Sequence, residues 1–138
     1  MARDIMIVKD VSKPYWKESG TIHFGDVDPT EWESLFFTDL NIRNYGDYTA
    51  EKGDSQTYED YYSKRISQIK EKFPLIVRTK DFYEDASFSK SEINRLIKEI
   101  LSLKEIVKRK ESIDFLNQLL EASEEALKND AGIIIVAD

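Results

Sequence analysis

The C-terminal segment 88–138 constrains the fold of this chain more than any other part of the sequence. It opens on a capping box, in which Ser89 and Glu92 are spaced to bond each other's backbone N–H groups at a helix start. Phe88 and Ile93 flank that box at the spacing of a hydrophobic staple, which fixes the angle at which the chain enters the helix. We therefore expect a well-defined helix to begin here.

Apolar residues at helical spacing continue this helix to Val107. A second apolar stripe predicts a helix over 112–129, and the break near Lys110 is short, so the two helices should form an antiparallel hairpin. Gly132 ends the second helix, and the run Ile-Ile-Ile-Val over 133–136 predicts a closing strand.

The rest of the chain alternates short strand and helix signals. Runs of β-branched and aromatic residues predict three further strands: 4–8, 21–24 and 75–77. Asp28 can cap a short helix that has Pro29 at its first position, and a longer amphipathic helix is predicted over 55–72. The polar segment 44–53 and the acidic segment 81–85 are expected to be loops.

Length and composition support one ordinary globular domain over 1–138. Apolar residues make up 41% of the 138 residues, which is enough for a real core. The chain has no cysteine, and this excludes a disulfide scaffold and any thiolate metal site. The order of the elements predicts an α+β fold, with a mixed or antiparallel sheet of about four strands covered by the C-terminal helix hairpin.

The net charge of −7 narrows the kinds of partner. An acidic surface repels the phosphate backbone, so we expect no nucleic-acid binding, and the protein partner should be basic. Residues 1–54 carry 11 acidic and 6 basic side chains, which makes this third of the chain the main source of acidity. The sequence has no apolar run of the length of a signal peptide or a membrane span, so we expect a cytoplasmic protein that does not enter membranes.

Signatures of metal or cofactor binding are weak. The segment that begins at Asp26 resembles the start of a calcium loop, but Glu31 stands where the tight turn needs glycine. Phe37 stands where a bidentate glutamate is needed. Helix capping explains these acidic residues better, so the sequence predicts no metal and no cofactor.

A small enzyme is the main alternative to a binding protein. His23 is the only histidine, and with Asp81, Glu84 and Asp85 it could supply general acid–base chemistry. No nucleophile motif accompanies it, and a structural or simply exposed histidine is the favoured interpretation. We therefore predict no catalytic residue, and we keep the enzyme and an adaptor subunit as open alternatives.

Aromatic side chains next to carboxylates predict a protein-binding surface, because buried aromatic anchors carry much of the affinity of such interfaces. Tyrosines in the predicted loop 44–53 should be exposed, and the segment 81–85 places two aromatics among three carboxylates. For 81–85 a solvated loop is the favoured interpretation, and a recognition loop for a cationic partner is the sharper alternative. The predicted partner-binding residues are Asp26, Asp28, Glu31, Tyr45, Tyr48, Asp81, Phe82, Tyr83, Glu84 and Asp85.

The run from Phe82 to Asp138 resembles small bacterial toxin-immunity proteins and their relatives. It begins Phe-Tyr-Glu-Asp-Ala-Ser-Phe-Ser, ends Ala-Gly-Ile-Ile-Ile-Val-Ala-Asp, and covers about two fifths of the chain. The resemblance rests on the helix-hairpin-strand pattern and carries over no functional residues. It implies a non-catalytic inhibitor or immunity protein that occludes a basic toxin or nuclease, and a phage-encoded inhibitor of a host defence protein would have the same pattern.

Overall fold

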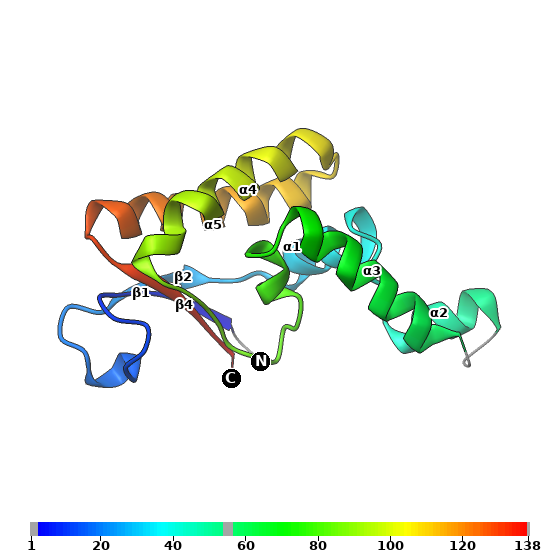
Figure 1. Ribbon diagram of the computed structural model, residues 1–138, viewed down its shortest axis with the longest axis horizontal. Coiled ribbons are helices and arrows are strands. Elements are labelled where there is room, and N and C mark those ends of the chain that lie inside the picture. The colour runs from blue at the N-terminus through cyan, green and yellow to red at the C-terminus, as the bar shows by residue number, and fades with distance from the viewer. Residues whose placement is uncertain (1–2, 54–56, 138) are drawn as a thin grey trace.

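The computed structural model describes residues 3–53 and 57–137, and its centre is one antiparallel sheet with the strand order β2-β1-β4-β3. The strands are β1 (Arg3–Val8), β2 (Ile22–Asp26), β3 (Ala86–Phe88) and β4 (Gly132–Ala137). Helices α4 (Ile93–Ile106) and α5 (Lys110–Lys128) form the expected hairpin and lie over one face of the sheet (Figure 1). The predicted α+β fold, with about four strands beneath a C-terminal helix hairpin, is confirmed.

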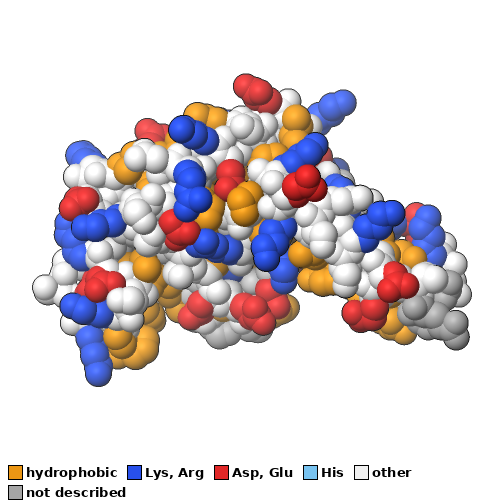
Figure 2. All heavy atoms as spheres, viewed as in Figure 1, with side chains coloured by type: hydrophobic (Ala, Val, Ile, Leu, Met, Phe, Trp, Pro, Cys, Tyr) orange, Lys and Arg blue, Asp and Glu red, His pale blue; other side chains and the backbone are white. Residues whose placement is uncertain are grey.

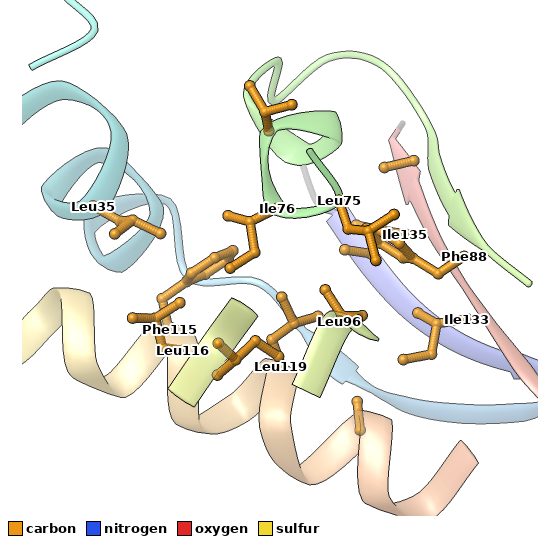
Figure 3. Packing of buried hydrophobic residues seen from close by; sticks show 14 of the residues in the cluster. Leu35, Leu75, Ile76, Phe88, Leu96, Phe115, Leu116, Leu119, Ile133 and Ile135 are labelled. Carbon is orange, nitrogen blue, oxygen red and sulfur yellow. The ribbon is translucent and has the colours of Figure 1, made fainter. Parts of the chain in front are cut away.

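The main core lies between the sheet and this hairpin. Leu96 of α4 and Leu119 of α5 point toward Ile133 and Ile135 of β4, and all four are fully buried (Figure 3). Ile5 of β1 pairs with Ile135 and is equally buried. The apolar stripes therefore meet as the periodicity predicted, and burial of this surface is the main stabilising contribution to the fold.

The capped helix after β2 forms as predicted and then changes its geometry. Asp28 accepts hydrogen bonds from the backbone N–H groups of Thr30 (2.8 Å) and Glu31 (3.2 Å) at the start of α1 (Pro29–Glu33). The next segment, Ser34–Asp39, is a π-helical turn, a form that often occurs at functional sites.

The strand predicted at 75–77 is wrong, because a 3₁₀ turn over Ile76–Thr79 occupies this part of the chain. The carboxylate of Glu99 in α4 accepts hydrogen bonds from the backbone N–H groups of Leu75 and Ile76, at 3.0 Å for the shorter contact to each. The Glu99 carboxylate therefore accepts the backbone hydrogen bonds that a neighbouring strand would otherwise have to accept. The fourth strand is instead β3, which pairs with β4.

The loop predicted over 44–53 is also wrong. It contains α2 (Tyr45–Lys52), and Asn44 caps this helix by accepting a hydrogen bond from the N–H of Asp47 at 2.8 Å. Helix α3 (Tyr58–Lys72) agrees with the predicted helix over 57–72, and the predicted start at 55–56 lies outside the described residues. Helices α2 and α3 extend away from the sheet (Figure 1).

Candidate functional site

The segment 81–85 is a loop as predicted, and its two aromatic residues have different environments. Phe82 is buried against Trp32, with the ring centroids 5.1 Å apart, whereas Tyr83 is 67% exposed. Asp81 accepts the backbone N–H of Tyr83 at 2.9 Å, and Asp85 accepts that of Ala137 at 2.8 Å. The loop is thus tied down by its own carboxylates and presents one aromatic ring to solvent.

A buried arginine that sequence reasoning missed holds this loop from below. Arg3 of β1 is fully buried and donates hydrogen bonds to the carbonyl oxygens of Thr79 (3.0 Å) and Glu84 (2.9 Å). Burial lowers the pKa of Arg3 to about 10, and the nearby carboxylates of Asp81 and Asp85 oppose that shift. Arg3 lies on the same face of β1 as Ile5 and Ile7, which is the core face. A charged side chain is ordinarily expected at the surface, so the sequence did not predict its burial.

Trp32 of α1 is fixed to the same anchor point. Its indole N–H donates to the Thr79 carbonyl at 2.8 Å, so this carbonyl accepts from both Trp32 and Arg3. The π-helical turn brings Phe37 edge-on to Trp32, with the ring centroids 5.1 Å apart. Trp32, Phe37 and Phe82 therefore form a rigid aromatic floor whose orientation is set by hydrogen bonds as well as by packing.

Two adjoining hollows lie on this floor, with volumes of about 540 Å³ and about 230 Å³. We call them together the aromatic groove. The residues that line both hollows are Trp32, Phe37, Asn44, Phe82 and Tyr83. The larger hollow is completed by Pro29 and Glu33; the smaller one is completed by Ile42, Arg43, Tyr58, Tyr62, Lys80 and Asp81.

A set of tyrosines continues from the groove into the α2–α3 pair. Tyr48 was expected to be exposed in a loop, but it is a helical residue and only 8% exposed. Its ring stacks on Tyr61 at 4.7 Å, and its hydroxyl bonds that of Thr57 at 2.8 Å. Tyr45 is exposed as predicted and packs edge-on against Tyr58 at 5.4 Å. Tyr48 therefore holds α2 on α3, and Tyr45 is the accessible member of the predicted pair.

The acidic residues predicted for binding lie on the other side of α1. Asp26, Asp28 and Glu31 line an open hollow of about 480 Å³ together with Asp114 and Glu121 of α5. Burial is the main cause that raises the pKa of Glu31, and repulsion from Asp28 and Asp114 adds to it. We call this surface the acidic hollow. Helix α1 separates it from the aromatic groove. The ten predicted binding residues are therefore divided among the 81–85 loop, the α2–α3 pair and the acidic hollow, and of the loop residues only Asp81, Phe82 and Tyr83 line the groove.

The carboxylate cluster proposed for the alternative enzyme is not assembled. His23 lies on β2 at one edge of the sheet, whereas Asp81, Glu84 and Asp85 precede β3 at the opposite edge. The carboxylates that lie close to the imidazole of His23 are those of Asp4 and Asp26.

A comparison of the chain with protein-family models, with curated proteins and with solved structures finds no match. Over residues 3–53 and 57–137, no helix has both the length and the apolar character that are needed to cross a membrane.

Proposed function

We propose that this protein is a non-catalytic binding module, and that its aromatic groove receives a segment of a basic protein partner. In this proposal it acts as an inhibitor or immunity protein that occludes a toxin or nuclease. The observation that carries the proposal is a preformed aromatic floor with the exposed ring of Tyr83 on its rim. Aromatic side chains in such positions commonly act as hot spots of protein interfaces.

Pre-organisation supports this role. Arg3 and Trp32 share the Thr79 carbonyl, and Phe82 is packed on Trp32, so the floor has little conformational freedom left to lose on binding. An interface that is already ordered loses less entropy when a partner binds. The same network explains why a loop rich in carboxylates holds a fixed conformation.

The carboxylates on both sides of α1 support a basic partner, although cationic side chains also lie near the groove. Glu33 and Asp81 line the groove, and the acidic hollow lies directly across α1, so a partner that crosses this helix meets carboxylates on both sides. Arg43 and Lys80 also line the groove. On the face shown in Figure 2, Lys and Arg side chains lie among carboxylates, so the negative charge is not uniform over the molecule. The partner segment should therefore have an apolar residue for the groove and cationic residues toward α1.

The test begins with capture of a partner from the source cells, followed by surface plasmon resonance with the purified pair. Tyr83→Ala should speed dissociation by about tenfold or more, because a buried aromatic anchor acts mainly on the off-rate. Trp16→Ala is the matched control, since Trp16 is 70% exposed but lies in the β1–β2 connection, away from the groove. Equal effects of the two substitutions, or none from Tyr83→Ala, would remove the support for the groove.

A second set of variants tests the charge argument. Glu33→Gln combined with Glu31→Gln removes one carboxylate on each side of α1. The pair should slow association at about 0.01 M ionic strength, and the difference should shrink at about 0.15 M because salt screens exposed charges. The exposed glutamates Glu105 and Glu124 on the helix hairpin, both changed to glutamine, provide a control of equal charge. If the control pair slows association equally, only the net charge matters and the partner is not guided to α1. The identity of the captured protein distinguishes toxin immunity from inhibition of a host defence protein.

A further inference from the structure

An irregularity in the pairing of β1 with β2 brings three metal-ligating side chains together. Asp4 pairs with Asp26, but Met6 pairs with His23, so β2 contains one residue more than β1 between these pairs. In a regular strand His23 and Asp26 would point to opposite faces, because their separation is odd. The extra residue restores them to one face, as bulges commonly do. Asp4, His23 and Asp26 therefore share the sheet face opposite to the one that carries Ile5.

The distances within this cluster suit a shared ion. The Nε2 atom of His23 lies 3.1 Å from Oδ1 of Asp26 and 3.6 Å from Oδ1 of Asp4. One ligand atom from each of the three residues can be chosen so that all lie within 4.8 Å of one another. Ligand atoms at a zinc distance of about 2.1 Å are about 3.4 Å apart when the geometry is tetrahedral. The two His23 distances lie on either side of that value.

Electrostatics adds a reason for a cation. Two carboxylates directly opposite each other on neighbouring strands repel and destabilise the pairing unless a positive charge lies between them. Here Asp4 and Asp26 are such a directly opposite pair, and the imidazole of His23 lies close to both carboxylates. Gln118 of α5 donates to the Asp26 carbonyl at 2.8 Å, which holds the end of β2 in place. The backbone that carries the three side chains is thus held by the sheet and by α5.

We propose that Asp4, His23 and Asp26 form a binding site for a divalent transition-metal ion of the Zn²⁺ class. One imidazole nitrogen with carboxylate oxygens favours Zn²⁺ and similar ions over Mg²⁺ or Ca²⁺, which prefer oxygen ligands alone. Three protein ligands leave a coordination position open to water or to a donor atom from another molecule. The side chains of His23, Asp4 and Asp26 are 54%, 35% and 66% exposed, so the ion would exchange readily with solvent.

The experiment is a titration of the full chain with Zn²⁺ by calorimetry, with NMR of the imidazole protons as a second readout. His23 is the only histidine, so its imidazole signals need no assignment. We expect saturable 1:1 binding, with the imidazole signals shifting in step with the heat. His23→Gln and Asp26→Asn should each weaken Zn²⁺ binding by about tenfold or more, as loss of a ligand requires.

Glu121→Gln is the matched control, because Glu121 belongs to the neighbouring acidic hollow but not to the cluster. Glu121→Gln should change the Zn²⁺ affinity by less than about twofold. All variants should have the melting temperature of the wild-type protein, because the substituted residues are surface groups. The proposal is overturned if Zn²⁺ does not saturate, or if His23→Gln binds as the wild type does. It is also overturned if the control loses as much affinity as Asp26→Asn, since the ion would then be a diffuse counterion of the acidic surface.

Discussion

Glu92→Gln tests how the start of the helix hairpin is tied to the 3₁₀ turn before β3. The Oε1 atom of Glu92 accepts the Ser89 backbone N–H at 3.0 Å and Nη1 of Arg78 at 3.0 Å, and Oε2 accepts Nη2 of Arg78 at 2.6 Å. Arg78 also donates to the Ser87 carbonyl at 2.9 Å. The predicted capping box is therefore confirmed, and it is extended by a bidentate ion pair.

The magnitude follows from the pKa of Glu92, which the hydrogen bonds from Arg78 lower from 4.5 to about 2, with Ser89 contributing and burial opposing. At about 1.4 kcal/mol per pKa unit, the full shift sets a ceiling of roughly 3.5 kcal/mol. The side chain of Arg78 is 39% exposed, so solvent screening reduces this by about half. We expect Glu92→Gln to lower the free energy of unfolding at pH 7 by about 1–2 kcal/mol.

The pH dependence has a definite sign. A carboxyl whose pKa is lower in the folded state stabilises the fold above its unfolded pKa of 4.5 and loses that effect as the pH falls toward about 2. Over half of the contribution should be gone by about pH 3. The stability difference between wild type and Glu92→Gln should therefore be largest near neutral pH and should narrow in acid.

The assay is urea unfolding followed by circular dichroism at several pH values, combined with a double-mutant cycle using Arg78→Met. Glu105→Gln, on the exposed face of α4, controls for the loss of one negative charge. A coupling energy below about 0.5 kcal/mol between Glu92 and Arg78 would refute the assignment of the stabilisation to this pair. So would a difference from wild type that stays constant from neutral pH to about pH 3.

Three further predictions concern the core, the start of β4 and metal removal. Leu119→Asp should cost several kcal/mol (about 3–5) in urea unfolding because it places an unpaired charge at a fully buried position, and an unchanged melting temperature would contradict that burial. Gly132→Ala should lower the melting temperature measurably, since an added Cβ would lie 2.4 Å from the Phe88 carbonyl oxygen. Gly46→Ala in α2 is the control, with its nearest atom at 3.6 Å, and should be neutral or slightly stabilising. Chelation with EDTA should leave the circular dichroism spectrum and the melting temperature unchanged; a large loss of either would reveal a structural metal.

Elements whose signals are local could be predicted from the amino-acid sequence. The capping box at Ser89, the cap at Asp28 and the apolar stripes of the hairpin each depend on residues within a few positions of one another, and all of them form as predicted. The strand 133–136 was predictable for the same reason, since a run of β-branched residues needs no distant information to favour an extended chain. The overall α+β class follows from these elements.

Segments whose conformation depends on distant partners could not be predicted in this way. Glu99 converts the apolar run at 75–77 into a 3₁₀ turn, because its half-buried carboxylate reaches the backbone donors of Leu75 and Ile76. Burial raises the pKa of Glu99, although those hydrogen bonds oppose the shift. Tyr61 of α3 stabilises α2 by stacking on Tyr48. The segment 44–53 has no apolar stripe of its own, so this helix could not be predicted from local sequence.

The candidate sites were decided in the same way. The sequence singled out Phe82 and Tyr83, yet Trp32 lies 50 positions earlier. The buried Arg3, which bonds the Thr79 and Glu84 carbonyls beside that loop, is further still. His23 could be recognised as the only imidazole, but its carboxylate neighbours depend on strand register, which one extra residue in β2 reverses. Local periodicity determines which residues form a helix or a strand, whereas pairing and packing between distant segments determine which side chains meet.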